Sequence, residues 1–516
     1  MKTVLIGVWL ATCWIFSFSF PSPFLDPKSL IFYLGSGCLF IYLLSKRTAP
    51  VNVHSFWIIL AWYFFLCVLS ISMSMAKYEG VLELARLLLW CGLGWSFSRL
   101  SAWDTLAKWS LVSAAVMAGF AGFLAVPGRN DQIIPLGHVS YYGNFMAMHI
   151  PMAAYLLFTD RKWWKVLWGV CLFFVSGGLI LSGARASMIG VVAGLLVALI
   201  LLRNWKAVIA AVAIPIVIMM AVPHVFNLYR FTKKPSVDFN LTQKRGFTAT
   251  LRMIRDRPLG WGLGNFRFVY PEYAKSPSEK KQSAVGAWYE HPHNEMLHQA
   301  VEVGILGWLF WLLGIVWIYF CGWRERNNPV VVFGLSGLTV ALVGWQLDTN
   351  FLQPLSRFMA AFYVGILWQP IKRHAPVLWN ISEVWVKRVG VTVAILCMLI
   401  VSAHQVSIYA VEKAKRSTDR AEMRKWTVFA TRLSSEFNSV YTNAATKTLT
   451  FGAKESASEI EGVFKAYPYV PVVLYLKAVL SHRQGNTDEA KQLLKHALRN
   501  DPSYKAAEVA IAWIDR

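Results

Sequence analysis

Apolar residues form repeated runs along this chain, and short polar loops separate the runs. A run of about twenty apolar residues makes a helix that can cross the hydrocarbon core of a bilayer. The pattern predicts thirteen such spans, at residues 4–20, 29–45, 55–74, 80–98, 109–126, 141–159, 166–182, 186–202, 206–222, 301–321, 329–346, 355–371 and 389–409. The first run is interpreted as a span and not as a signal peptide, because no small-residue cleavage site precedes Pro21.

Two stretches interrupt this pattern, and they divide the chain into four parts. Residues 1–222 and 301–410 hold the predicted spans, residues 223–300 form a large polar loop, and residues 411–516 are charged and nearly free of long apolar runs. The predicted fold is therefore an all-α polytopic membrane protein with a large loop and a C-terminal soluble helical domain.

The distribution of charge predicts which side of the membrane each loop faces. Lys and Arg total 51 against 28 Asp and Glu, an excess that would also suit a nucleic-acid-binding protein. The basic residues, however, cluster in alternate short loops, such as those at residues 46–47, 161–165 and 372–373. Basic loops stay in the cytoplasm, so we expect the 223–300 loop and the 411–516 tail to lie outside, and we expect no nucleic-acid partner.

Several titratable residues lie at the mouth of the apolar run that opens at Val301. The segment begins His291-Pro-His-Asn-Glu and includes His298. A histidine has an unperturbed pKa near 6.5 and can take the proton of a hydroxyl at neutral pH, so His293 is the predicted general base. Asn294 stands beside it, and Glu295 or Glu290 is placed to orient its ring.

Arginines of the outer loop and of one tight turn are candidates for binding phosphate. Arg252 and Arg255 precede Pro258 and a glycine-rich turn over residues 260–266, which we expect to be flexible. Arg185 lies between two apolar runs, where a charge is costly unless it reaches an anion or a cavity. Guanidinium groups can hold phosphate oxygens through two hydrogen bonds. The plainer alternatives are a solvated basic face for the loop arginines and an interfacial side chain for Arg185.

Three pieces of the chain together resemble the bacterial O-antigen ligase and polymerase superfamily, which includes the protein O-oligosaccharyltransferases. They are the small-residue turn of residues 182–187 around Arg185, the arginine helix with the glycine turn at residues 252–266, and the histidine-asparagine segment at residues 293–307. The resemblance covers roughly residues 130–350. The thirteenth span and the exported tail are additional to the twelve-span ligase pattern.

This resemblance implies a metal-independent and cofactor-independent glycosyltransferase in the inner membrane of a bacterium. Such an enzyme moves a glycan from an undecaprenyl-pyrophosphate carrier to an acceptor on the periplasmic face. The acceptor is left open between lipid A core, the growing glycan and Ser or Thr of an exported protein. His138, in the predicted outer loop 127–140, is a further candidate for the donor cavity.

The tail carries a pattern typical of a tetratricopeptide repeat. Small residues recur at Ala478, Ala490, Ala497 and Ala507, with a glycine at the turn and Pro502 closing the unit. Because one repeat does not make a stable stack, we expect the helices before it to be degenerate repeats. Such a domain binds peptides or partner proteins, and a plain helical hairpin is the alternative.

Two other functions could use the same residues. His291, His293 and His298 could bind zinc, but their spacing is not the His-Glu-x-x-His form and no cysteine lies near. A flippase or transporter of lipid-linked glycans would suit the number of spans. Against it, the predicted spans hold few acidic residues, and Glu83 and Arg86 in one span are three residues apart and can pair.

Overall fold

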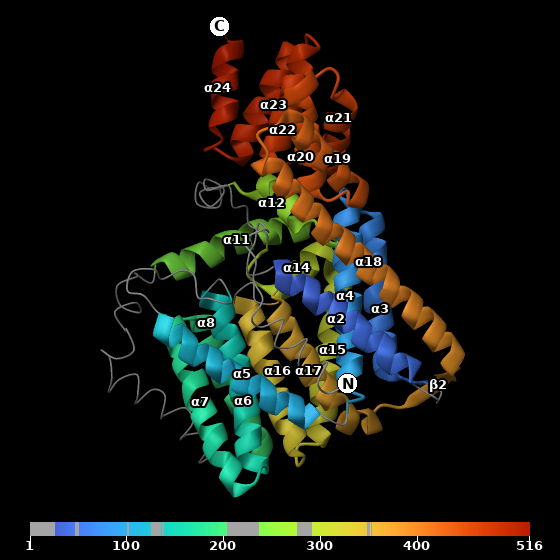
Figure 1. Cartoon of the computed structure of the whole chain (residues 1–516), viewed down its shortest axis with the longest axis vertical. Coiled ribbons are helices and arrows are strands. Elements are labelled where there is room, and N and C mark those ends of the chain that lie inside the picture. Colours follow the sequence, from blue (N-terminus) through green and yellow to red (C-terminus); the bar gives the residue numbers. More distant parts are fainter. Residues whose placement is uncertain are drawn as a thin grey trace.

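The chain folds as an α-helical bundle with a smaller helical domain at one end (Figure 1), in a computed structural model. The structure describes residues 26–46, 51–100, 103–124, 136, 139–203, 237–275, 291–347, 351 and 353–515. The predicted spans at 4–20 and 206–222, and the candidate His138, lie outside these residues. The predicted all-α fold is confirmed.

Eleven long helices make the bundle in the described part of the chain. They are α2 (Asp26–Ser45), α3 (Ser55–Ser72), α4 (Lys77–Phe97), α5 (Trp103–Leu124), α6 (Val139–Thr159), α7 (Lys162–Ser182), α8 (Arg185–Leu202), α15 (Gly304–Arg324), α16 (Pro329–Leu347), α17 (Pro354–Ile371) and α18 (Glu383–Arg416). Within the described residues, eight of them are long and apolar enough to cross a membrane: α2, α3, α4, α7, α8, α15, α16 and α18. The chain is thus a multi-pass membrane protein.

Glycines let some of these helices approach closely. A Cβ on Gly190 of α8 would lie 2.9 Å from the Val340 carbonyl oxygen of α16, and a Cβ on Gly194 would lie 2.7 Å from that of Ser336. Because lipid is as apolar as the helix surfaces, membrane helices associate through such close contact of small residues. The pairing runs antiparallel, so Arg185, at the start of α8, lies at the level of the end of α16.

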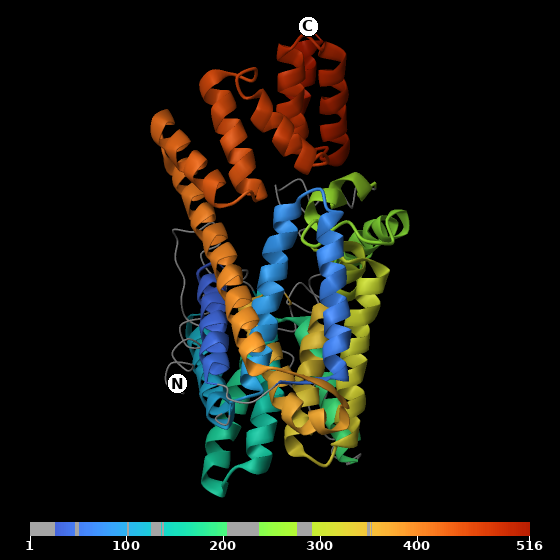
Figure 2. The ribbon, with the colours of Figure 1, turned by 90° about the vertical axis from the view of Figure 1, so that its right-hand side faces the viewer.

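The two ends of the bundle differ in character. One end carries α11 (Val237–Asp256), α12 (Phe266–Tyr273), α14 (Glu295–Glu302) and the loop between α3 and α4 (Figures 1 and 2). The opposite end carries the short antiparallel pair β1 (Val51–His54) and β2 (Val377–Ile381), together with η3 (Lys372–His374). Among the described residues, the basic loops between α6 and α7 and between α15 and α16, and the basic segment after α17, lie at this second end (Figure 1).

The C-terminal domain consists of six helices. They are α19 (Arg420–Leu433), α20 (Phe437–Phe451), α21 (Ala457–Ala466), α22 (Pro471–Arg483), α23 (Thr487–Asn500) and α24 (Lys505–Ile514). The four alanines of the repeat pattern are buried where α22, α23 and α24 meet. Gly485 has a φ of +92° in the turn between α22 and α23, a conformation that favours glycine. The small residues therefore pack as predicted, while assignment to the tetratricopeptide family stays a prediction.

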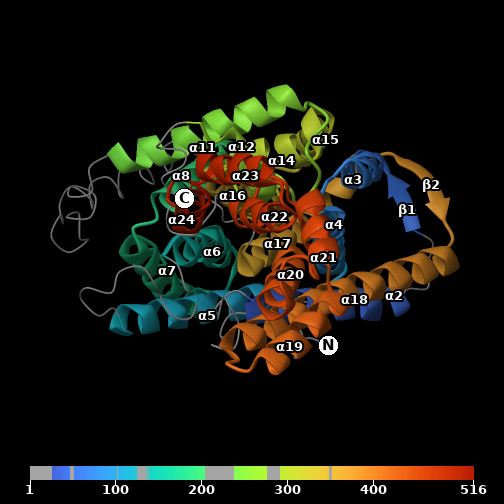
Figure 3. The same ribbon diagram turned by 90° about the horizontal axis from the view of Figure 1, so that it is seen from above.

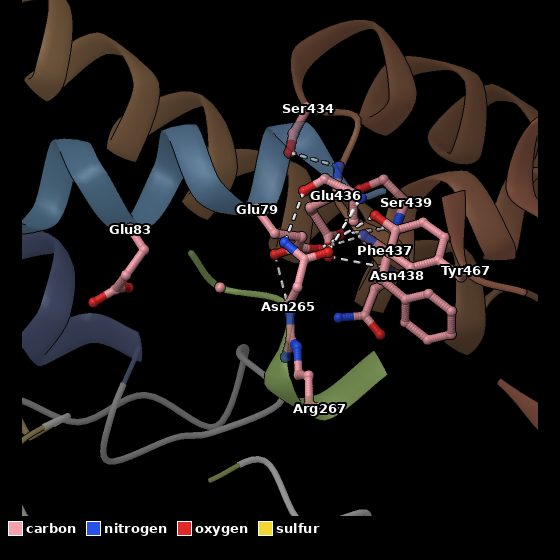
Figure 4. A network of polar contacts seen from close by, with 12 residues as sticks. Glu79, Glu83, Asn265, Arg267, Ser434, Glu436, Phe437, Asn438, Ser439 and Tyr467 are labelled. Carbon is pink, nitrogen blue, oxygen red and sulfur yellow. Dashed lines mark hydrogen bonds and ion pairs between the residues drawn. The ribbon is translucent and has the colours of Figure 1, made fainter. Parts of the chain in front are cut away.

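α18 joins the bundle to this domain without interruption, running past the predicted boundary at residue 410 to Arg416. The domain also docks on the bundle through Glu79 of α4 (Figure 4). The buried Glu79 carboxylate accepts hydrogen bonds from the Phe437 backbone N–H at 2.9 Å and pairs with Arg267 of α12 at 3.1 Å. Rings of Phe268, Phe437 and Tyr467 pack around this contact.

A second docking contact joins α12 to α23. Glu272 lies 2.6 Å from Nε2 of His496 and 2.9 Å from Nη2 of Arg499. Burial raises the pKa of the Glu272 carboxyl, but the hydrogen bond and charge of His496 and the charge of Arg499 outweigh burial and lower it. α12 is thus held between the bundle and the C-terminal domain.

Candidate active site

The histidine segment forms a short helix of its own. The predicted span 301–321 begins instead at Gly304, because α14 ends at Glu302 and the chain bends at Gly304, where φ is +85°. Asn294 caps α14: its Oδ1 accepts a hydrogen bond from the Leu297 N–H at 2.9 Å. Its Nδ2 donates to the Gln346 carbonyl oxygen at 3.1 Å. The cap therefore ties the segment to the end of α16.

The glycine-rich turn is held by hydrogen bonds and is not the flexible loop that the sequence suggested. Gly260, Gly262 and Gly264 all have positive φ, at +93°, +102° and +74°. This backbone lets the turn follow the end of α14: the Trp261 N–H donates to the Val301 carbonyl at 2.8 Å. A Cβ on Gly260 would lie 2.5 Å from the Glu302 carbonyl oxygen. Only glycine fits this close approach.

Glu302 connects the turn with the histidines. Its side chain is 3% exposed, and its two oxygens accept from the N–H groups of Gly264 at 2.8 Å and Phe266 at 3.0 Å. Nε2 of His298 lies 3.2 Å from the same carboxylate, and Nδ1 of His298 lies 3.5 Å from Oε2 of Glu295. His298 is thus enclosed between two buried carboxylates.

The surroundings of His298 favour its protonated form. Burial alone lowers the pKa of its imidazole, but the charges and hydrogen bonds of Glu302 and Glu295 outweigh burial and raise it well above 6.5. A protonated ring neutralises the carboxylates and cannot accept another proton at neutral pH.

The raised pKa predicts a pH effect on stability. The stabilising contribution of a group with a raised folded-state pKa is complete below its unfolded value, near 6.5, and is lost as pH rises through the folded value. We therefore expect wild-type protein to lose thermal stability above about pH 7, and His298→Gln to lack this loss. Thermal unfolding in detergent at increasing pH measures it; identical pH dependence of both proteins would contradict the assignment.

The surroundings of His291 shift its pKa in the opposite direction from that of His298. Burial first, and then the positive charges of His298 and Arg267, hold the pKa of its imidazole well below 6.5. The rings of His291 and His298 meet edge to face, with centroids 5.1 Å apart. A neutral His291 beside a charged His298 avoids placing two cations together.

His293 has a backbone conformation that is uncommon for residues other than glycine. Its φ is +53°, in the left-handed region. For a residue other than glycine this costs about 1–3 kcal/mol, and such residues cluster at functional sites. His293 stands between the buried Pro292 and the cap residue Asn294, at the mouth of α14.

Glu295, predicted to orient His293, is engaged elsewhere. Its Oε1 accepts from Nε2 of Gln299 at 2.6 Å, and its Oε2 faces His298. Gln299 in turn accepts from the Tyr63 hydroxyl of α3 at 2.8 Å. The alternative partner Glu290 lies outside the described residues. Glu295 thus holds α14 against the bundle.

The predicted arginines lie at the same end of the bundle but in different settings. Arg252 of α11 is half-buried, and its Nη2 donates a hydrogen bond to the Tyr273 carbonyl oxygen of α12 at 2.6 Å. The Arg255 side chain is 77% exposed and pairs with the adjacent Asp256. Arg185 begins α8, after the left-handed Gly183. The structure therefore places Arg252 between α11 and α12, and Arg255 at the surface.

Sequence reasoning missed a buried ion cluster in the bundle. Arg357 of α17 is 1% exposed and contacts Glu83 at 2.6 Å, the Tyr33 hydroxyl at 2.5 Å and the Phe351 carbonyl at 2.9 Å. The predicted pair of Glu83 with Arg86 is confirmed at 3.2 Å. A lone arginine within an apolar run was the signal that could have identified Arg357.

The alternative zinc site is not supported by the geometry of the described residues. There, no group of three or more His, Cys, Asp or Glu side chains is arranged to hold a metal ion. His298 instead lies beside carboxylates, and His291 packs against the ring of His298.

A family model described as O-antigen ligase matches residues 170–312. No curated protein matches the chain. The matched range contains Arg185, Arg252, the glycine turn and the whole histidine segment. These residues lie at the same end of the bundle. The match supports the O-antigen ligase superfamily and, with it, a membrane glycosyltransferase type of enzyme acting on a lipid-linked glycan and an acceptor.

Proposed function

We propose that this protein transfers a glycan from an undecaprenyl-pyrophosphate carrier to an acceptor hydroxyl at the end of the bundle that carries α14. The observation that carries the proposal is the strained His293, held by a hydrogen-bonded loop within the region that matches the O-antigen ligase family. The pKa of His298 is raised well above 6.5 by its two carboxylate neighbours, and burial lowers the pKa of His291 well below it, which leaves His293 as the proposed base.

The proposed reaction is a displacement at the sugar. The acceptor oxygen attacks the anomeric carbon, the bond from that carbon to the pyrophosphate oxygen breaks, and undecaprenyl pyrophosphate leaves. His293 takes the hydroxyl proton. Arg252 and Arg185 stabilise the negative charge that develops on the leaving group, with Arg255 attracting the carrier from the surface.

The acceptor is proposed to be a hydroxyl of lipid A core, of a glycan, or of Ser or Thr in an exported protein. The docked C-terminal domain favours a protein acceptor or assembly partner, because α12 joins it directly to the turn that holds Glu302. Comparing lipopolysaccharide ladders with glycoprotein blots from a strain that lacks the gene distinguishes these acceptors.

Arg→Lys substitutions test the chemistry. Lysine keeps the charge but loses the two-pronged fit to phosphate, so Arg185→Lys and Arg252→Lys are expected to lower turnover strongly while donor still binds. The assay uses purified protein in detergent with lipid-pyrophosphate glycan and acceptor, and it measures released undecaprenyl pyrophosphate. Wild-type protein that releases none, yet moves labelled carrier across liposomes, would establish the transporter alternative instead.

The proposed orientation has its own test. We propose that the end with α14 and the C-terminal domain faces the periplasm, because the basic loops lie at the other end. Alkaline phosphatase fusions after residues 275 and 450 should then be active, and a fusion after residue 326 inactive. An inactive fusion at 450 would place the C-terminal domain in the cytoplasm.

A further inference from the structure

The end of the bundle opposite α14 carries a polar hollow that is lined in part by basic residues. This hollow has a volume of about 410 Å³, and its lining includes Arg99, Lys372 and Arg373, with Trp57, Trp95 and Trp368. No acidic residue is among its described lining residues. The nearest carboxylate contact is that of Glu325, which lies 3.3 Å from Nε of Arg373 and 2.7 Å from His374.

Helix packing brings these cations together. α4 and α17 approach closely, since a Cβ on Gly365 would lie 2.7 Å from the Gly94 carbonyl oxygen. Arg99 follows the end of α4 and Lys372 follows the end of α17. Burial and the neighbouring charge of Arg99 both lower the pKa of Lys372. The C-terminus of a helix favours a nearby cation. That preference explains Arg99 and Lys372 separately, but it does not explain why a hollow lies between the cations.

An apolar cavity of about 910 Å³ continues from this hollow along the bundle. Val51, Trp57 and Trp95 line both spaces. The remaining lining of the cavity is almost entirely apolar and comes from α2, α3, α4, α18 and the β1–β2 pair. Figure 3 shows α3 standing apart from α18, with β2 leading into the start of α18. Its size lies at the upper end of the usual range for ligand sites, about 300–1,000 Å³.

We propose that this composite site binds an anionic glycerophospholipid, with its phosphate among Arg99, Lys372 and Arg373 and its acyl chains in the cavity between α3, α4 and α18. The combination of cations, then tryptophans, then apolar walls matches the order of a phospholipid's parts from headgroup to chain. A free phosphate would use only the polar hollow.

This site is separate from the proposed glycan chemistry. None of His293, Arg185 or Arg252 lines either space. The lipid fills the region where α3 stands away from α18, the helix that carries the C-terminal domain. Bound lipid therefore stabilises the frame on which that domain is mounted.

Binding is tested on the full-length protein, purified in detergent and stripped of lipid. Native mass spectrometry and thermal unfolding are followed while phosphatidylglycerol, phosphatidylcholine, diacylglycerol or glycerol phosphate is added. We expect phosphatidylglycerol to bind and to raise the unfolding midpoint more than the other three. Removing the three charges together, in Arg99→Gln/Lys372→Gln/Arg373→Gln, should weaken its binding by about a hundredfold.

Matched variants separate the headgroup from the chains. Lys387→Gln/Arg388→Gln removes two charges at the same end but outside the lining, and should bind as wild type does. Ala61→Trp, which fills the cavity, should also weaken binding, whereas Val68→Trp, on an exposed part of the same helix, should not. Equal binding of phosphatidylcholine, full competition by glycerol phosphate, or wild-type binding by Ala61→Trp would each overturn the proposal.

Discussion

His293→Asn is expected to lower glycan transfer by about 10²–10⁴-fold, the usual contribution of a general base, while the protein keeps its fold. Asparagine is the right replacement because it tolerates the left-handed backbone that His293 adopts. The substitution thus removes the imidazole without changing the turn. Turnover is measured in detergent with lipid-pyrophosphate glycan and acceptor, and stability by thermal unfolding.

Two further variants complete this test. His293→Gly removes the ring and relieves the backbone strain, so it should be as stable as wild type or more so, and equally inactive. His291→Ala should weaken transfer less, because a ring with a pKa well below 6.5 is a poor proton acceptor. Near-normal turnover by His293→Asn would exclude His293 as the base.

The positions of the bundle helices in the described residues could be predicted from the sequence because the bilayer imposes a simple rule. Each crossing needs one apolar run of sufficient length, and its backbone must be paired internally. That rule located the eleven bundle helices, most of them to within four residues; α5 begins six residues before its predicted span, and α18 extends six residues before and seven after its own. It missed the bend at Gly304, since the run from Val301 to Cys321 is apolar apart from Glu302 and the positive φ of Gly304 separates α14 from α15.

The candidate site was only partly predictable. The histidine segment and the arginines were recognisable from residue type and spacing, and they lie at one end of the bundle. The partners of these residues were not, because pairing depends on folding across long sequence distances. Glu302 meets a turn 36 to 38 residues earlier, and Arg357 meets Glu83 across 274 residues. A local sequence pattern does not predict contacts between residues that are so far apart in the chain.

Glu302→Gln is the second variant with a large expected effect. The wild-type carboxylate accepts two backbone N–H groups and faces the His298 cation. An amide has one oxygen, so its NH₂ group must face a backbone donor or the imidazolium. Breaking a buried ion pair by removing one partner costs about 3–5 kcal/mol, and we expect a loss of this order in the free energy of unfolding.

Loss of transfer should accompany this loss of stability, because the glycine turn and α14 hold His293 in its strained conformation through Glu302. Glu302→Asp, which keeps the charge on a shorter side chain, should be intermediate in both measurements. Glu489→Gln, on an exposed part of α23, serves as the control and should match wild type. If Glu302→Gln unfolds at the wild-type temperature and transfers glycan at the wild-type rate, then the buried carboxylate does not organise the site, and the strain at His293 must be maintained by the Asn294 cap and the contacts of α16 alone.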